Sequence, residues 1–246
     1  MLLSRWLTGR AWLLFAGLLG FGLPVGWSAI RAGVGPTPLL PDVIVWADRA
    51  RHLLYGWTLD RREQPGRVLL RLTTAIPNQG AGPMELVGGE THPDGTQDVY
   101  QRIYNDDGTY ADVLAGVFVH HPEHNHIHFE GYAVYRLRAV TDEGGVGDVV
   151  AEGDKVSFCL IDVLVYDRRL PGFPRTAQYR TCNATRQGVS VGWADVYEKS
   201  LPDQWIDVTD VPNGQYWLEV EVDPENRLLE SDETNNVTRI SIVLRK

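Results

Sequence analysis

The feature of this sequence that most limits its fold is the lack of helical periodicity. After residue 60, no stretch places apolar residues at helical spacing over three turns, and the one earlier amphipathic candidate, residues 46–55, is short. The chain instead alternates short runs of β-favouring residues with Gly, Pro, Asn or Asp, and it contains 25 Gly, 14 Pro, eight Trp and ten Tyr. This pattern predicts an all-β protein, and we expect a β-sandwich-like single domain with long irregular loops.

Nine runs are expected to form strands. They are residues 42–47, 67–76, 98–104, 117–129, 133–139, 155–165, 205–208, 216–222 and 237–244. Two segments, 77–97 and 167–193, exceed the usual length of a connection and are expected to be irregular, as binding loops or disordered chain. At 246 residues with 43% hydrophobic composition, the chain is long enough to bury a sizeable core.

The first thirty residues differ from the rest of the chain. Arg5 and Arg10 precede a long apolar run, and no acidic residue occurs before Asp42. This arrangement predicts that residues 1–29 are a signal peptide or, because the apolar run approaches the length that spans a bilayer, an uncleaved N-terminal membrane anchor. In either case the chain from Pro36 onward is expected outside the cytoplasm, as a secreted, periplasmic or outward-facing protein.

The charge and the cysteine count exclude several classes of protein. The formal net charge is −9, and leaving out the three arginines that precede Pro36 brings it to about −12, so a nucleic-acid partner is not expected. Cys159 and Cys182 are the only cysteines, which excludes a disulfide-dense scaffold and a four-cysteine metal site. Outside the cytoplasm the two can form one disulfide, which would contribute about 3 kcal/mol of stability.

Five of the seven histidines lie within nine residues, from His120 to His128. His124, His126 and His128 alternate with other residues, so on a strand their imidazoles share one face. Imidazole-rich ligation suits copper or zinc rather than calcium or magnesium, and we interpret the three as metal ligands rather than solvated histidines. His120 and His121, separated from the three by Pro122, are candidates for supporting contacts.

Two further segments gain meaning only beside the histidines. Taken alone, Lys155 is most simply a turn lysine in solvent, and Asp195 and Tyr197 belong to a partly buried aromatic segment. Three motifs in order resemble the lysyl oxidase family: His-x-His-x-His at 124–128, Ala-Glu-Gly-Asp-Lys-Val-Ser-Phe-Cys at 151–159, and Asp-Val-Tyr at 195–197. The likeness extends from about Leu40 to the C-terminus, so that residues 36–246 are expected to be a lysyl oxidase-like catalytic domain.

The resemblance implies a copper amine oxidase that oxidatively deaminates primary amines, including peptidyl lysine, to aldehydes, with O2 as the acceptor and ammonia and H2O2 as products. His124, His126 and His128 match the family's copper ligands. Lys155 and Tyr197 match the residues that form lysyl tyrosylquinone, and Asp195 matches the catalytic base. With only two cysteines the disulfide pattern must be simpler than in animal members, and Cys159–Cys182 is the only intrachain pairing. Animal members also carry another histidine shortly after the copper motif, where this chain has residues 129–135 without one.

A second metal site is implied near the C-terminus. The hard oxygen donors match a calcium site of the family, and they are Asp42, Glu230, Asp232, Asn235 and Asn236. The alternative is a hairpin turn whose polar side chains cap backbone amides. Two alternatives to an amine oxidase also stay open: an extracytoplasmic metal-binding β-sandwich module without quinone chemistry, and an adhesion-type β-sandwich with incidental histidines.

Overall fold

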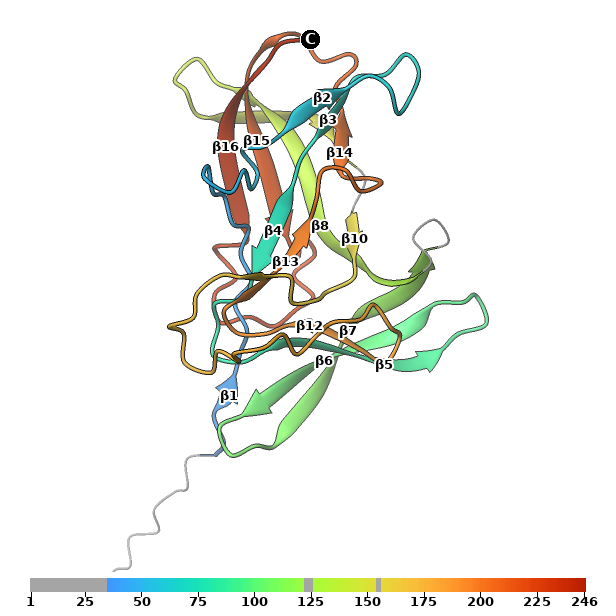
Figure 1. The fold of residues 1–246 in the computed structure, drawn as a ribbon, viewed down its shortest axis with the longest axis vertical. Helices are drawn as coiled ribbons and strands as arrows, with labels where there is room; N and C mark the ends of the chain where they lie inside the picture. Colours follow the sequence, from blue (N-terminus) through green and yellow to red (C-terminus); the bar gives the residue numbers. More distant parts are fainter. Residues whose placement is uncertain (1–34, 122–125, 154–155) are drawn as a thin grey trace, which may run out of the picture. The chain divides into compact units, whose positions relative to one another are not determined.

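The structure is a computed structural model that describes residues 35–121, 126–153 and 156–246. The predicted leader, residues 1–29, therefore lies outside the described residues, as do His124 and Lys155. Residues 36–246 form one compact unit. Every regular element in the described residues is a β-strand, which confirms the all-β prediction (Figure 1). The described residues include no helix that could span a bilayer.

The strands group into one large sheet and two small ones. Their bounds are β1 (Pro38–Leu39), β2 (Thr58–Asp60), β3 (Leu69–Arg71), β4 (Thr74–Pro77), β5 (Met84–Thr91), β6 (Gln97–Asn105), β7 (Tyr110–His121), β8 (His126–Val140), β9 (Val146–Glu152), β10 (Val156–Phe158), β11 (Leu164–Val165), β12 (Arg186–Val189), β13 (Trp193–Tyr197), β14 (Trp205–Asp207), β15 (Gly214–Val222) and β16 (Val237–Leu244). The large sheet runs β12-β5-β6-β7-β8-β15-β16, with β1 on β6 and with β9 and β10 on β8. The small sheets run β11-β13-β4 and β14-β3-β2.

The long strand β8 organises the molecule because it pairs with four others. Its first residues pair with the end of β7, its middle pairs with β10, and its second half pairs with β15 and β9 (Figure 1). Tyr132 and Tyr135 of β8 are fully buried, and they belong to one hydrophobic core with Phe158 of β10 and Ile206 of β14. β8 is therefore covered by residues from other sheets, which explains its nearly continuous apolar sequence from residue 131 to 135.

Four local expectations were wrong. The predicted 155–165 strand is not continuous, because residues 159–163 separate β10 from β11. Residues 77–97 are not irregular: they contain β5, which pairs with β6 and β12. Gly88 and Gly89 hide this strand in the sequence, but a Cβ at Gly88 would lie 1.9 Å from the Ala184 carbonyl oxygen, so the close approach of the chain requires glycine there. The 42–47 strand is absent; that segment runs beside β4 through the amides of Ile44 and Trp46, which bond Pro77 and Ala75. β12 interrupts the expected irregular segment 167–193.

The predicted disulfide is present between Cys159 and Cys182, whose Cα atoms are 5.3 Å apart. It joins the chain just after β10 to the loop that precedes β12. Ile127 of β8 is held by this loop and by β12, because its amide donates to the Cys182 carbonyl at 3.3 Å and its carbonyl accepts from Gln187 Nε2 of β12 at 2.9 Å. The disulfide loop thus supports the strand that carries the histidines.

Candidate metal and redox site

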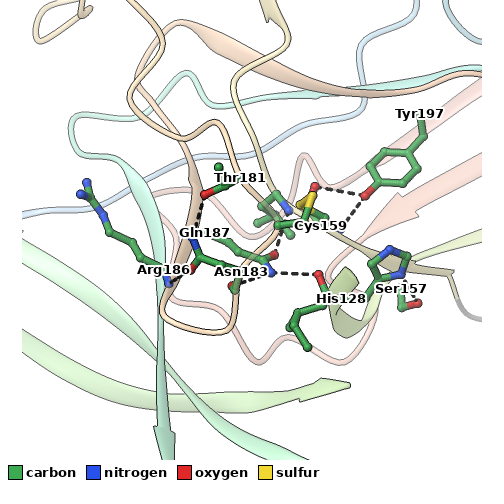
Figure 2. The surroundings of a disulfide bond; sticks show 11 residues. His128, Ser157, Cys159, Thr181, Asn183, Arg186, Gln187 and Tyr197 are labelled. Atoms are coloured by element: carbon green, nitrogen blue, oxygen red, sulfur yellow. Dashed lines mark hydrogen bonds between the residues drawn. A yellow bond between two sulfur atoms is a disulfide. The ribbon is translucent and has the colours of Figure 1, made fainter. Parts of the chain in front are cut away.

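His126 and His128 lie on one face of β8, as the alternating pattern predicts. Their ring centroids are 4.7 Å apart with an interplanar angle of 48°. His128 is 1% exposed, and its Nδ1 lies 3.0 Å from the Ser157 hydroxyl of β10 (Figure 2). If Nδ1–H donates to this hydroxyl, Nε2 is left as the nitrogen that can bind a metal. Two of the three predicted ligands are thereby brought together, while His124 lies outside the described residues.

The neighbouring histidines take different positions on β7. His120 pairs with Ile127 and His121 pairs with His126. Because side chains alternate along paired strands, His120 occupies the face opposite to His126 and His128, and it is exposed. Direct support of a metal at those two histidines is therefore not expected from His120.

Tyr197 is fixed against the backbone of Cys159. Its hydroxyl donates to the Cys159 carbonyl at 3.0 Å and accepts from the Cys159 amide (Figure 2). Its ring meets Phe158 edge-on, with centroids 4.0 Å apart. Burial, followed by the charge of Asp195, raises the pKa of the Tyr197 phenol well above its usual range. β13 therefore presents a neutral phenol to the same three-residue stretch, 157–159, whose Ser157 contacts His128.

Asp195 is buried two residues before Tyr197. Its side chain is 2% exposed, and neither carboxylate oxygen has a hydrogen-bond partner of good geometry among the described residues. Burial raises the pKa of Asp195 well above its usual range, and the backbone amides of Val196 and Ile161 only partly oppose this shift. A buried, unpartnered carboxyl of this kind is costly to folding and is typical of functional sites.

Lys155 lies outside the described residues, but Gly153 and Val156, close to it in the chain, are described. The Gly153 amide donates to the Tyr135 carbonyl at 2.9 Å, and Val156 pairs with Ala133 of β8. The segments that flank Lys155 and Tyr197 are therefore folded together beside the histidine strand.

Two residues of this region escaped the sequence analysis. Ser157 stands within a motif that was singled out, but its contact with His128 depends on the pairing of β10 with β8. Tyr132 is fully buried, its hydroxyl has no partner among the described residues, and burial together with the charge of Asp195 raises its pKa well above the usual range. Tyr132 stands in a run of buried apolar residues, so the sequence does not indicate that the charge of Asp195 acts on its hydroxyl.

The C-terminal acidic cluster gathers most of the predicted calcium ligands. Asn235 Nδ2 donates to Asp42 Oδ1 at 2.9 Å, and Asn236 Nδ2 donates to Glu230 Oε1 at 3.1 Å, across up to 193 residues of chain. The amide oxygens of both asparagines are buried without a partner in the described structure. Asp232 instead is exposed and accepts from Thr234.

The structure adds two carboxylates to this cluster, since Asp223 and Glu233 each offer an oxygen close to that of Glu230. Burial raises the pKa of Glu230 to about 8, and the nearby charges of Glu233 and Asp223 add to the shift. A divalent cation would reduce the repulsion among these carboxylates and would give the two asparagine amide oxygens a partner.

Comparison with known proteins identifies the family to which this chain belongs. The family model described as lysyl oxidase matches residues 113–246, and the chain belongs to the lysyl oxidase family. It is 36% identical over 222 residues to lysyl oxidase homolog 2 of Xenopus tropicalis and 28% identical over 222 residues to that of Gallus gallus. Each alignment covers 88% of this chain and 26% of the relative.

A shorter alignment, to human lysyl oxidase homolog 1, is 40% identical over 123 residues, or 50% of this chain and 20% of the relative. The chain thus spans about a quarter or less of the length of these curated relatives.

Proposed function

We propose that this chain is a copper- and quinone-dependent amine oxidase of the lysyl oxidase type. It would convert a primary amine, O2 and water into an aldehyde, ammonia and H2O2, with free amines or peptidyl lysine as substrate. The observation that carries the proposal is that residues 157–159 contact both sites at once: Ser157 contacts His128, while Phe158 and Cys159 contact Tyr197. Oxidation of a tyrosine side chain by a bound metal and O2 requires the metal site and the tyrosine to lie close together.

The described histidines fit copper. Both offer imidazole nitrogens, which copper(II) accepts readily, and the contact of His128 Nδ1 with Ser157 fixes the ring orientation before a metal arrives. We assign His124, His126 and His128 as the ligands. His128 would be the most rigid of them, since it is buried and pinned by Ser157.

Lys155 and Tyr197 are the residues that we assign to the quinone cofactor. Copper with O2 would supply the oxidation that joins the two side chains as lysyl tyrosylquinone, which in turn offers an electrophilic carbonyl that no standard side chain provides. The Cys159 backbone holds the Tyr197 hydroxyl and thereby fixes the ring plane. Phe158 closes one side of the ring against water.

Asp195 is assigned as the base that removes the α-proton of the bound amine. Neither of its oxygens has a well-aligned hydrogen-bond partner among the described residues, so each retains capacity to accept a proton from the substrate. A raised pKa makes the carboxylate form of Asp195 a stronger base for removing a proton from carbon.

A calcium site at the C-terminal cluster is proposed as a structural element. Of the predicted ligands, Asp42, Glu230, Asn235 and Asn236 would supply it together with Asp223 and Glu233, whereas Asp232 is exposed and engaged with Thr234. The amide oxygens of the two asparagines, which have no hydrogen-bond partner among the described residues, support it. Localisation outside the cytoplasm, with residues 1–29 as signal peptide or anchor, stays a prediction from the sequence.

The decisive experiment is aerobic copper loading of the purified protein, followed by spectroscopy and peptide mapping. We expect a visible quinone absorption, a cross-linked peptide pair joining residues 155 and 197, and H2O2 release that depends on a primary amine. Lys155→Ala and Tyr197→Phe should each abolish the absorption and the activity while copper stays bound. Lys199→Ala and Tyr110→Phe are matched controls, because Lys199 bonds the Gly56 carbonyl elsewhere and Tyr110 is exposed.

The same experiment separates the enzyme from its main alternative. Copper-replete, oxygen-exposed protein with unmodified peptides at 155 and 197 would identify an extracytoplasmic metal-binding β-sandwich module without quinone chemistry. Asp195→Asn should leave the cross-link intact and slow turnover by about a hundredfold or more, as the loss of a general base predicts.

A further inference from the structure

The connection between β11 and β12 forms a cavity that the amine oxidase chemistry does not use. It has a volume of about 430 Å³ and is lined by Val165, Arg168, Phe173, Arg175 and Trp193. No acidic residue lines it. Trp193 begins β13 and Tyr197 ends it, so the cavity lies about 13 Å along the strand from the proposed quinone position.

No ion pair with a described residue neutralises the two arginines of this cavity. Asp167, the nearest acid in the sequence, is engaged by Arg169, whose amide, Nε and Nη2 all donate to it at 2.8–2.9 Å. These contacts lower the pKa of Asp167 to about 2, so it stays ionised and bound to Arg169. No hydrogen bond, ion pair or ring contact joins Arg168 or Arg175 to another described residue. In a chain of formal net charge −9, two unpaired guanidinium groups on one cavity are suited to an anion.

Two aromatic rings form one wall of the cavity, and their contacts hold them in place. Phe173 and Trp193 are stacked, with ring centroids 6.0 Å apart and an interplanar angle of 11°. Trp193 Nε1 donates to the Pro174 carbonyl at 3.0 Å. Behind the wall, Gly192 has φ +75°, and a Cβ there would lie 2.8 Å from Phe173 Cδ2. The wall is therefore fixed before any ligand binds, which reduces the entropy lost on binding.

We propose that this cavity binds a carboxylated sugar, as a free uronic acid or as a uronic acid unit of an acidic polysaccharide. The carboxylate would accept hydrogen bonds from Arg168 and Arg175, and the C–H face of the sugar ring would pack on the aromatic wall. The cavity volume matches a ligand of this size. A neutral sugar could pack on the aromatic wall but would leave both arginines without a counter-charge. An inorganic anion could pair with the arginines but has no apolar face to pack on the wall.

The test is titration calorimetry of the purified full chain with glucuronate, glucose, benzoate and a tetrasaccharide of uronic acid. We expect glucuronate to bind, and Arg168→Gln or Arg175→Gln to weaken it at least tenfold. Arg169→Gln is the matched control: it lies on the same loop, is 90% exposed and does not line the cavity, so binding should be unchanged. Phe173→Leu should weaken glucuronate while leaving the melting temperature close to that of the parent.

The outcomes divide clearly. A tetrasaccharide that binds at least tenfold more tightly than glucuronate supports a polysaccharide ligand, and equal affinity supports a free sugar acid. The proposal is overturned if glucose binds as well as glucuronate, if benzoate binds more tightly, if the Arg168→Gln/Arg175→Gln double variant retains parental affinity, or if glucuronate does not bind the parent. None of these results depends on copper or on the quinone.

Discussion

At the scale of single residues, Ser157 connects the histidine strand to the rest of the site. Replacing Ser157 with Ala removes the partner of His128 Nδ1, so the ring loses its preferred orientation. We expect copper affinity to fall about 10–100-fold, the usual effect of losing a ligand's supporting contact. Competition with a chelator measures this affinity without any assay of turnover. Unchanged affinity in Ser157→Ala would contradict the assigned role.

The same strand supplies a stricter prediction. His126→Ala should abolish stoichiometric copper binding, because one of three imidazole ligands is lost and the remaining two hold copper weakly. Elemental analysis of the purified, dialysed variant checks this. His92→Ala serves as the control, since His92 pairs with Asp98 on β6 and is not part of the histidine motif. A full equivalent of tightly bound copper in His126→Ala would refute the ligand assignment.

Asp195 gives a prediction about pH. Because burial raises its folded-state pKa, the unfolded chain ionises first as pH rises above about 4, and the free energy of unfolding falls until the folded-state pKa is reached. Asp195→Asn removes the ionisable group and therefore this fall in the free energy of unfolding. The variant should melt at least about 2 °C higher than the parent at pH 7, in metal-free protein, with a smaller difference at pH 4.

Asp162→Asn provides the opposite control for this measurement. The Asp162 carboxylate accepts from the amides of Gln178, Tyr179 and Ser190, and an asparagine cannot accept all of these bonds. The Asp162→Asn variant should therefore have a lower melting temperature than the parent. A lower melting temperature for Asp195→Asn at pH 7 would show that its carboxylate has a stabilising partner.

At the scale of elements, the disulfide joins the end of β10 to the loop before β12. Replacing both Cys159 and Cys182 with Ser should cost about 3 kcal/mol, or about 6–12 °C in melting temperature. Differential scanning calorimetry of the variant and the parent measures this. Because Ile127 and Tyr197 both bond backbone atoms of these cysteines, copper affinity should fall as well. A stability loss with unchanged copper binding would show that the loop does not support β8.

The bend of β8 at Gly131 gives a second prediction for this scale. Gly131 has φ +68°, and a Cβ there would lie 2.8 Å from Arg227 Nη2, whose guanidinium lies over Phe129 and bonds the Glu130 carbonyl. Gly131→Ala should cost about 2 kcal/mol in urea unfolding, from backbone strain and the displaced arginine. Gly108→Ala has a similar φ and no atom within 4 Å, so its cost should be about half. Equal costs would indicate that Arg227 moves freely.

At the scale of the whole molecule, the acidic cluster ties the first residues of the domain to the last hairpin. Calcium at about 100 times its dissociation constant should stabilise the fold by about 2.7 kcal/mol, raising the melting temperature by about 5–10 °C. Glu230→Gln should lose this increment, whereas Asp94→Asn, whose carboxylate bonds Thr96 on a distant turn, should keep it. A calcium response that persists in Glu230→Gln would place the ion elsewhere.

The strand class, the disulfide and the position of His126 and His128 on one strand face could all be predicted without the structure. These follow from local rules: period-two alternation sets which side chains share a face, and the lack of helical periodicity removes the competing class. The sequence also indicated Asp195 and Tyr197 through resemblance to a family. It misjudged residues 77–97, because the glycines required by a close neighbouring chain read locally as a loop.

Only the tertiary structure decided which of these residues meet. Ser157 reaches His128 because β10 pairs with β8, and Tyr197 reaches Cys159 because β13 packs across that pair from another sheet. The lack of a well-aligned hydrogen-bond partner for the Asp195 carboxylate among the described residues is likewise a result of packing. Contacts between residues distant in the chain depend on how sheets stack and where loops return, and local periodicity carries no information about either.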